Sequence, residues 1–425
     1  MQTKIAVFVG KSIYSLSRIL KRGGGSAAPG LYALKLDSQL VEKLSSQIPV
    51  NIVITGTNGK TTTAKLLDHF AKANDLKVIR NSTGSNLERG IASTLISSNS
   101  LKKQDLGIWE LDEAAFNSVV PKLKPQAIVF LNVFRDQLDR YGEVDNVVKK
   151  WVEVVKILPQ TTQIFINGDD GNLLEIKSAF KGKVTTFGLT DNKILGEKQS
   201  AVPNKLEVKA EDIKLTGISA SSFQLTVNHD QLTINLPLAG IYHIYDFLAA
   251  YLLARYLKIS EDKILGSLKS FSPAFGRVEK INLKSGKEAF VFLIKNPTGA
   301  TQVLKTIAPE IKLNDRILMA LNDNFADGTD VSWIWDTEFE QLRTKNYELR
   351  TICSGTRAYD LALRLKYAGM NINSLYIEDS LKKAFAEAQK GLQGRLFILP
   401  TYTAMLELQH IFATEGLKEK YWETQ

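Results

Sequence analysis

The order of apolar and polar positions predicts strands that alternate with helices. In the first half, apolar runs typical of buried strands cover 50–54, 105–111 and 126–133, and a helical pattern runs from Ala64 to Ala73. The last third repeats the alternation. Its predicted strands are 288–294, 316–321, 348–353 and 396–399, and its predicted helices are 300–307, 357–368 and 379–390. Such alternation favours α/β domains with mostly parallel sheets.

These patterns predict three parts of the chain. Residues 1–45 form an N-terminal basic helical segment, residues 46–268 a central domain with a mostly parallel sheet, and residues 277–425 a second, Rossmann-like α/β domain. The stretch S-F-S-P-A-F-G at 270–276 is typical of a linker. Within the central domain, we expect a β-rich excursion at about 190–236, with short strands such as Ser222–Val227 and Gln231–Leu236.

Composition excludes several classes of protein. The 425 residues are 44% hydrophobic, with 54 basic and 45 acidic side chains and a net charge of +9. A single cysteine, Cys353, leaves no intramolecular disulfide and no multi-cysteine metal site, so no structural zinc is expected. No apolar run reaches the roughly 18 residues that span a bilayer. We therefore expect a cytoplasmic protein whose positive charge favours anionic partners.

The N-terminal segment predicts a basic amphipathic helix over 4–22. Its apolar positions at helical spacing are Val9, Ile13, Leu16 and Leu20, and no acidic residue precedes Asp37. Such a helix can lie on anionic lipid, which would make the protein peripheral at the inner membrane face. It can also pack its apolar face on the protein body. The density of basic residues is not extreme, so we favour packing on the body.

A phosphate-binding loop is predicted where the first strand meets its helix. The segment T-G-T-N-G-K-T-T-T spans 55–63. In this context a glycine loop directs backbone N–H groups toward phosphate, the lysine at Lys60 reaches the terminal phosphates, and the Thr61 hydroxyl is placed for Mg²⁺. The general P-loop has a glycine six positions before the lysine, but that position is Ile54 and the glycine is Gly56. The loop is therefore a shortened variant.

Acidic residues follow the next two predicted strands. Glu110, Asp112 and Glu113 end one of them, and Asp136 and Asp139 follow the other beside Arg135. Ligands of open α/β sheets bind outside the carboxyl ends of the strands, where a carboxylate can hold Mg²⁺. Each acid can also be a helix cap or a first-turn charge. That interpretation is weakest for Glu110, which lies within its own strand.

These residues resemble the Mur ligase superfamily of ATP-dependent ligases. The resemblance extends from about residue 45 to the end, through E-L-D-E-A (110–114), L-N-V-F-R-D-Q-L-D-R-Y-G (131–142), I-N-G-D-D (166–170), G-I-Y-H-I-Y-D-F-L-A-A (240–250) and F-G-R-V-E (275–279). It implies ATP and Mg²⁺ as cofactors, Lys60 and Glu110 as catalytic residues, and Thr61 and Glu110 at the metal. The residues it matches to the nucleotide are Gly56, Thr57, Asn58, Gly59, Lys60, Thr61, Thr62, Asn167, Asp246 and Arg277.

Within the superfamily, the chain is most similar to the MurT branch, the ligase-like subunits of lipid II isoglutaminyl synthases. Gln137 replaces a histidine of ordinary Mur ligases. Further segments that carry the likeness are R-G-G-G-S-A-A-P-G (22–30), K-N-P-T-G-A (295–300), D-G-T-D-V-S-W-I-W-D (327–336), S-G-T-R-A-Y-D-L-A-L-R-L-K-Y-A-G (354–369) and L-P-T-Y-T-A-M-L-E-L (399–408). The resemblance implies ATP-dependent amidation of the D-glutamate α-carboxylate in the stem peptide of lipid II.

The same resemblance implies a heterodimer with a GatD-type class I glutaminase that supplies ammonia. No nucleic-acid partner is expected, because a basic helix alone is not a nucleic-acid motif and no aromatic-basic platform is evident. An aspartate of the ligase subunit would complete the partner's Cys–His pair. By motif the candidate is Asp330, with Asp327 and Asp336 as reserves. Asp330 can also cap the helical run after it, but we slightly favour the catalytic role. Trp333 and Trp335 can anchor a partner, but aromatic residues at this spacing are more often core, which we favour.

The sequence departs from the family pattern at several points. The four-cysteine zinc ribbon of many members is missing, and His243 and Asp246 replace two asparagines, so the adenine contacts stay open. No position for a carbamylated lysine is identified. Arg277 can neutralise charge at the transferred phosphoryl group or form a salt bridge at the domain junction.

Two other functions compete with amidation. One is a Mur-type or folylpolyglutamate-synthase-like ligase that adds an amino acid, which the C-terminal motifs disfavour. The other is a non-catalytic nucleotide-binding scaffold. The presence of Lys60, Thr61 and Glu110 together argues against lost catalysis.

Overall fold

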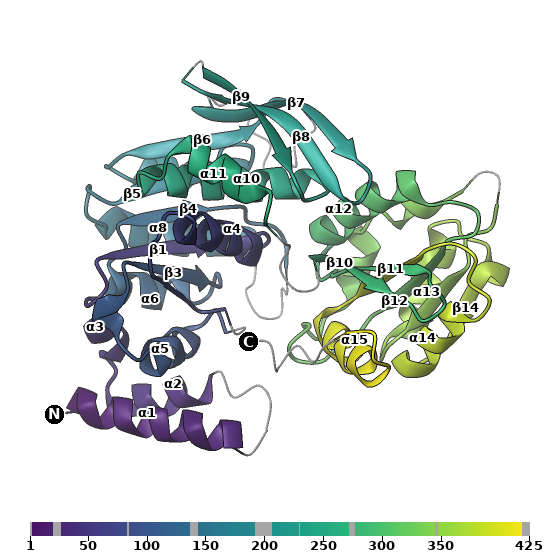
Figure 1. The fold of residues 1–425 in the computed structure, drawn as a ribbon, viewed down its shortest axis with the longest axis horizontal. Coiled ribbons are helices and arrows are strands. Elements are labelled where there is room, and N and C mark those ends of the chain that lie inside the picture. Colours follow the sequence, from purple (N-terminus) through teal and green to yellow (C-terminus); the bar gives the residue numbers. More distant parts are fainter. Residues whose placement is uncertain are drawn as a thin grey trace.

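The computed structural model describes residues 2–19, 27–82, 85–136, 143–191, 206–228, 230–271, 277–344 and 347–418, with the backbone alone for 17–19 and 277. Two α/β domains lie side by side (Figure 1). Both contain largely parallel sheets, which confirms the predicted fold class.

The N-terminal domain is built on a nine-stranded sheet in the order β2-β3-β1-β4-β5-β6-β7-β8-β9. Its strands are β1 (Val50–Thr55), β2 (Val78–Arg80), β3 (Leu106–Leu111), β4 (Ala127–Phe130), β5 (Gln163–Asn167), β6 (Val184–Leu189), β7 (Val208–Thr216), β8 (Ala220–Val227) and β9 (Asp230–Leu236). In this order, the seven strands from β2 through β1 to β7 run parallel to their neighbours. Strand β8 pairs antiparallel with both β7 and β9. The β-rich excursion therefore extends the edge of the main sheet.

Helices cover both faces of this sheet because its central strands are apolar on both sides. In β1, Ile52 and Ile54 enter one core while Val53 enters the other, as the two-residue period of a strand requires. The helices are α3 (Leu40–Ser45), α4 (Lys60–Lys72), α5 (Glu88–Ser97), α6 (Phe116–Leu123), α8 (Val144–Ile157), α9 (Leu174–Ala179), α10 (Ile241–Tyr256) and α11 (Glu261–Leu268). Helices α4 and α10 pack on one face, and α5, α6 and α8 lie on the other.

Two further helices, α1 (Gln2–Ile19) and α2 (Ala28–Leu36), pack on α5. Contact with the body is made by Ala6, by Gly10 and by partly buried Val7. Val9 and Ile13 are half-buried, and Leu16 is exposed. The prediction that the apolar face packs inward is therefore wrong for part of that face. Small residues allow α1 closer to its neighbours than the larger apolar ones would, and this selects the buried side.

The C-terminal domain has a six-stranded sheet in the order β10-β11-β15-β12-β13-β14, parallel except for the β10–β11 pair. Its strands are β10 (Arg277–Asn282), β11 (Glu288–Phe292), β12 (Arg316–Ala320), β13 (Thr351–Ser354), β14 (Leu375–Ile377) and β15 (Leu396–Pro400). Its helices are α12 (Pro297–Ile307), α13 (Ala358–Tyr367), α14 (Leu381–Gln389) and α15 (Tyr402–Thr414). An apolar core lies on each face of the sheet.

The two tryptophans of the C-terminal domain differ in burial. Both lie in the 3-10 helix η4 (Ser332–Asp336), where Trp333 packs partly against the core. Trp335 is 50% exposed, with its ring centroid 5.7 Å from that of Tyr367 and the Arg364 guanidinium 5.8 Å above it. The core assignment is therefore wrong for Trp335. Side chains two residues apart on a 3-10 helix point in different directions, so Trp333 and Trp335 cannot both face the core.

Among the described residues, no helix combines the length and the apolar character needed to cross a membrane.

Candidate active site

The predicted phosphate loop connects the carboxyl end of β1 to the first turn of α4. Two glycines make its turns, Gly56 with φ of 138° and Gly59 with φ of 92° at the N-cap of α4. Both lie where a side chain is excluded. A Cβ on Gly56 would lie 2.8 Å from the Asn132 carbonyl oxygen, and one on Gly59 would lie 2.1 Å from Asp246 Oδ1. The loop is thus closely packed on both sides.

Asn132, just after β4, holds the loop in place. Its backbone oxygen accepts a hydrogen bond from the Thr57 N–H at 3.1 Å. Its side chain accepts from the Asn58 N–H at 2.8 Å and donates to the Asn58 oxygen at 3.1 Å. Thr57 Oγ1 also accepts from the Phe134 N–H at 3.0 Å. Since β1 and β4 are neighbours in the sheet, these bonds secure the loop to the adjoining strand end.

Lys60 is the buried cation of the site. Its ammonium group donates to the Gly56 carbonyl and lies 3.6 Å from Asp112 Oδ1 and 3.6 Å from Glu113 Oε2. Burial lowers the pKa of Lys60, but the surrounding carboxylates, Glu113 first, outweigh it and raise the pKa above its usual value. Burial likewise opposes ionisation of Glu113, yet Lys60 and then Lys295 hold its pKa below the ordinary range. The site therefore keeps a charged lysine beside charged carboxylates.

Thr61 and Glu110 meet directly behind the loop. Thr61 Oγ1 donates to Glu110 Oε2 at 2.8 Å, and the Glu110 side chain is almost fully buried at the end of β3. The Arg80 guanidinium lies 3.9 Å from the other carboxylate oxygen of Glu110. Asn81 accepts from the Glu110 N–H at 2.9 Å and donates to the Glu110 carbonyl at 2.9 Å. These contacts bring the predicted hydroxyl and carboxylate together.

The C-terminal domain reaches the loop through the segment before α12. The Lys295 ammonium donates to the Thr57 carbonyl at 3.0 Å and to Asp136 Oδ2 at 3.0 Å. Asn296 and Asn58 exchange amide hydrogen bonds of 3.0 and 3.3 Å. The Asn296 oxygen also accepts from the Gly299 N–H and so caps α12. The cap of one helix is thereby joined to the phosphate loop of the other domain.

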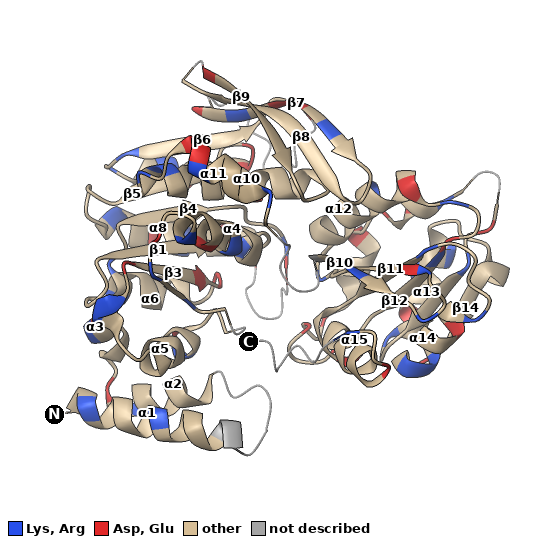
Figure 2. Cartoon of the chain, viewed as in Figure 1, with Lys and Arg blue, Asp and Glu red and all other residues tan. Residues whose placement is uncertain are grey.

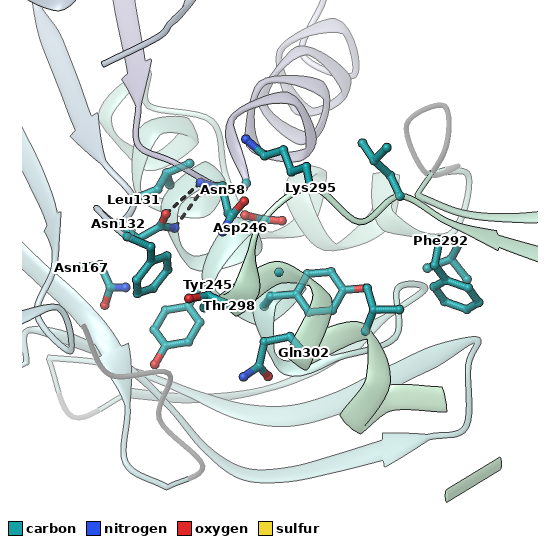
Figure 3. Close-up of a pocket in the computed structure, with 17 residues that line it drawn as sticks. Asn58, Leu131, Asn132, Asn167, Tyr245, Asp246, Phe292, Lys295, Thr298 and Gln302 are labelled. Carbon is teal, nitrogen blue, oxygen red and sulfur yellow. Dashed lines mark hydrogen bonds between the residues drawn. The ribbon is translucent and has the colours of Figure 1, made fainter. Parts of the chain in front are cut away.

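A pocket opens beside this contact, between the two domains. Figure 3 shows the Asn58–Asn132 hydrogen bonds close to Asp246. The pocket is lined from both domains by Asn58, Gly59, Leu131, Asn132, Phe134, Asn167, Tyr242, Tyr245, Asp246, Val278, Phe292, Leu293, Lys295, Thr298, Gly299, Gln302 and Val303. Aromatic rings with a few polar groups at one end suit a planar ligand that carries phosphates.

Two buried polar residues predicted at the nucleotide lie at this pocket. Asp246, on α10, has Oδ2 3.0 Å from His243 Nδ1 and Oδ1 beside Gly59. Asn167, at the end of β5, accepts from the Asp169 N–H at 3.0 Å. Thr62 is buried in the first turn of α4, away from the pocket lining. Arg277 begins β10, but its side chain lies outside the described residues, as do Gln137 and Asp139.

Comparisons with known proteins agree with this architecture. The Mur ligase middle domain matches residues 54–254, and the MurT ligase C-terminal domain matches residues 293–405. The chain is 30% identical to the MurT subunit of lipid II isoglutaminyl synthase (glutamine-hydrolyzing) from Staphylococcus aureus, over 95% of this chain and 96% of that protein. The chain belongs to the MurT family. The namesake subunit from Streptococcus pneumoniae is 29% identical over 99% of both chains.

Solved structures resemble this MurT-family chain in fold. MurF ligase from Thermotoga maritima, in complex with ADP, superposes with a TM-score of 0.68 at 13% identity, over 90% of this chain and 84% of that one. Folylpolyglutamate synthase from Mycobacterium tuberculosis, complexed with ADP, gives 0.66 at 15% identity, over 94% and 98%. Because ligases with different names share this fold with the MurT-family chain, the fold alone does not distinguish amidation from addition of an amino acid.

The three aspartates considered for the partner's site differ in environment in this MurT-family chain. Asp327 is buried, and its carboxylate accepts from the Thr403 N–H at 2.8 Å and the Thr403 hydroxyl at 2.5 Å. Burial raises its pKa despite these bonds. Asp330 and Asp336 are exposed, and Asp330 accepts from the Ser332 N–H at 2.8 Å. The hydrogen bonds from Ser332, and Arg135 with them, lower the pKa of Asp330.

Two residues of the site are not predicted by the sequence analysis of this MurT-family chain. Glu113 and Asp136 are expected there at the carboxyl ends of strands, with a helix cap as the alternative, and both are buried against lysines. Lys295 and Asn296 had no assigned role, although they begin the segment K-N-P-T-G-A. The signal was the Asn-Pro pair itself, since a capping residue followed by proline marks the start of a helix whose N-terminus can face a ligand.

Proposed function

We propose that this chain is the ATP-dependent ligase subunit of a lipid II amidating enzyme. It phosphorylates the α-carboxylate of D-glutamate in the stem peptide and forms D-isoglutamine. The observation that carries this proposal is the 30% identity to a MurT subunit over nearly the whole of both chains, C-terminal domain included. UDP-N-acetylmuramate–L-alanine ligases match smaller parts of the chain, from 54% to 80% of it, at 24 to 29% identity.

In the first half-reaction, a carboxylate oxygen attacks the γ-phosphorus of ATP and ADP leaves. Both reactants are anions, so the site must neutralise charge. The loop is surrounded by two cations, Lys60 and Lys295, and by the positive end of the α4 helix dipole. Arg277 is assigned to charge neutralisation from its motif. Asp246 acts as a positioning residue for Gly59, and Asn167 lies at the far wall of the pocket.

Thr61 and Glu110 suit Mg²⁺ because a hydroxyl and a carboxylate oxygen lie 2.8 Å apart beside the phosphate loop. The described residues contain no cluster of three or more histidine, cysteine or acidic side chains that could enclose a metal. A site of one or two protein oxygens is typical of Mg²⁺ that is held mainly by nucleotide phosphates and water. When bound, the ion would neutralise charge on the transferred phosphoryl group.

In the second half-reaction, the ammonia nitrogen attacks the acyl carbon, phosphate leaves, and one proton is released as the amide forms. Free ammonia would be protonated in water, so a docked glutaminase of the GatD type is the source that fits. Asp330 is the aspartate best placed to complete its catalytic pair, because it is exposed, ionised and within electrostatic reach of Arg135 beside the loop. The two Asp327 oxygens are occupied by Thr403.

The partner surface would include the exposed aromatic side chains near Asp330. Trp335 and Tyr367 lie together on η4 and α13, and Tyr359 is exposed on the same helix. Aromatic residues with an accessible face are enriched at the energetic centres of interfaces. The heterodimer would act in the cytoplasm, on a lipid-linked substrate at the inner membrane face.

The test is a reaction of purified chain with ATP, Mg²⁺ and lipid II, supplied with ammonium or with glutamine, and read by mass spectrometry of the stem peptide. Conversion of acid to amide with ammonium alone, and with glutamine only when the glutaminase is added, is expected. A Lys60→Ala variant should form no amide in either case. Addition of an amino acid in place of ammonia would contradict the proposal and favour the peptide-ligase alternative.

A further inference from the structure

Helix α1 turns its small residues inward and large apolar residues outward. Ala6 and Gly10 are buried, and a Cβ on Gly10 would lie 2.9 Å from Ile96 Cδ1 on α5. In contrast, Phe8 is 71% exposed, and Leu16 and Ile5 are exposed to about half. Large apolar side chains are stabilised by removal from water, so leaving them exposed on a fixed helix calls for an explanation.

The exposed apolar residues form one strip along α1. Positions 5, 8 and 16 fall within roughly a quarter of the helix circumference at 3.6 residues per turn. Lys4 and Lys11, seven residues apart, lie along one edge of this strip and are exposed. An apolar strip with a basic edge is the pattern of helices that lie in the interface of a bilayer.

Charge is one-sided over the whole segment. Residues 1–36 contain six basic side chains and no acidic one. The first acid, Asp37, is buried, where it accepts hydrogen bonds from Thr3 at 2.7 Å and from Lys43 at 3.0 Å. The Asp37 carboxylate is therefore paired within the fold and does not face the surface of α1. Figure 2 shows basic residues on α1 and no acidic residue along its described part.

Helix α2 adds to this surface. Leu31, Tyr32 and Leu36 are each exposed by more than a third, and the Lys35 ammonium lies 5.5 Å from the centroid of the Tyr32 ring. Gln2 donates to the Leu36 carbonyl at 2.7 Å and ties the start of α1 to the end of α2. In Figure 1 the two helices lie on the outer side of α5, away from the C-terminal domain. Neither helix contributes a residue to the lining of the pocket between the domains.

We propose that the exposed faces of α1 and α2 form a docking surface for an anionic bilayer. The apolar strip would enter the headgroup region while Lys4 and Lys11 contact the anionic headgroups, and neither helix would cross the membrane. The inference stands on this surface and not on the amidation chemistry, although it would hold the proposed active site near a lipid-linked substrate.

The test is flotation of the full chain with vesicles of neutral phosphatidylcholine or with vesicles containing about one third phosphatidylglycerol. Binding to the anionic vesicles is expected, and it should fall in about 0.5 M salt because exposed charges are then screened. The double variant Ile5→Gln/Phe8→Gln should bind at least roughly tenfold more weakly, since it lacks two apolar side chains that would enter the bilayer. Lys4→Glu/Lys11→Glu should lose at least about as much, at roughly fivefold per lysine.

Matched controls are Ile157→Gln and Lys156→Glu at the end of α8, which are equally exposed and outside the surface. They should bind like the unaltered chain, and circular-dichroism melting should show all variants folded. Equal binding to neutral and anionic vesicles, or unchanged binding of the Ile5/Phe8 variant, would overturn the proposal. So would a dimer in sedimentation that the Ile5/Phe8 variant abolishes, because a second copy would then cover the surface. Amidation assayed in detergent is a separate readout.

Discussion

Gly59 has no room for a side chain, and this determines how the phosphate loop can be built. Its φ of 92° lies in the left-handed region, and Asp246 occupies the place of a Cβ at 2.1 Å. The carboxylate of Asp246 is held in turn by His243. A glycine here lets the first N–H groups of α4 approach a phosphate closely while the acid beneath positions the turn.

Gly59→Ala should weaken ATP binding by roughly ten- to hundredfold, because both the backbone strain and the clash with Asp246 add about 1–3 kcal/mol. Isothermal titration with ADP measures the change. Gly266→Ala is the matched control, since a Cβ there meets nothing within 4 Å in α11. That control should leave ADP binding unchanged and raise stability slightly. Equal affinity of both variants for ADP would exclude a constrained loop.

Glu113 should contribute stability that depends on pH. Its folded pKa lies below the ordinary 4.5, so the contribution is present above about pH 4.5 and is lost as the pH falls through the folded value. Glu113→Gln should lower the free energy of unfolding by about 1–3 kcal/mol at pH 7, because Lys60 loses one buried partner. The difference from the unaltered chain should shrink as the pH falls below 4.5.

Urea unfolding at several pH values measures this difference. The exposed Glu153→Gln on α8 is the control and should change stability little at any pH. A deficit for Glu113→Gln that stays constant down to the acid range would mean that the carboxylate is not ionised beside Lys60.

At the scale of elements, local sequence pattern predicted those parts of the site whose residues are close together in the chain. The strand, loop and helix around Lys60 follow one another within some 20 residues, so periodicity and glycine placement were sufficient. The contact of Lys295 with Asp136 joins residues 159 apart, and no local pattern encodes it. The orientation of α1 was missed for a related reason, because its buried side is chosen by the fit of Gly10 against Ile96.

The segment before α12 should therefore be tested as part of the site. Lys295→Met keeps the length of the side chain but removes the charge that contacts Asp136 and Thr57. If the proposed reaction takes place at the loop, it should lower kcat for amidation by about ten- to hundredfold, since one cation beside the loop is lost. Steady-state kinetics with ammonium measures the effect.

Lys305→Met, within α12, is the control, because Lys305 forms an exposed ion pair with Glu338 at 3.0 Å. Such surface pairs contribute little, and kcat should be unchanged. If both variants behave alike, Lys295 only joins the domains and takes no part in the reaction.

At the scale of the whole molecule, the two domains complete one site. The loop, Lys60 and Asp246 come from the N-terminal domain, and Lys295, Asn296 and Phe292 from the other. Val278, at the bulge that opens β10, lines the same pocket with φ of 58°, a conformation that costs a β-branched residue about 1–3 kcal/mol. Strain concentrated at a domain junction is typical of positions that are determined by function.

The position of Asp330 yields a prediction that separates the two reactions of the proposed heterodimer. It lies on the C-terminal domain, exposed, yet within electrostatic reach of Arg135 from the N-terminal domain. If it completes the glutaminase, Asp330→Asn should abolish glutamine-dependent amidation, by about a hundredfold or more, as expected for a residue that orients a catalytic histidine. Amidation from ammonium should stay within about twofold of the unaltered chain, because the phosphate loop is untouched.

Both reactions are read in the same mass-spectrometric assay, with glutamine or ammonium as the only varied reagent. Asp336→Asn, which alters an exposed neighbour at the end of η4, serves as control and should retain both activities. Loss of the ammonium reaction in Asp330→Asn would place this residue in the ligase chemistry itself. Loss of glutamine-dependent amidation in Asp336→Asn instead would mean that Asp336, and not Asp330, completes the glutaminase. Retention of binding to the partner distinguishes either result from simple failure to dock.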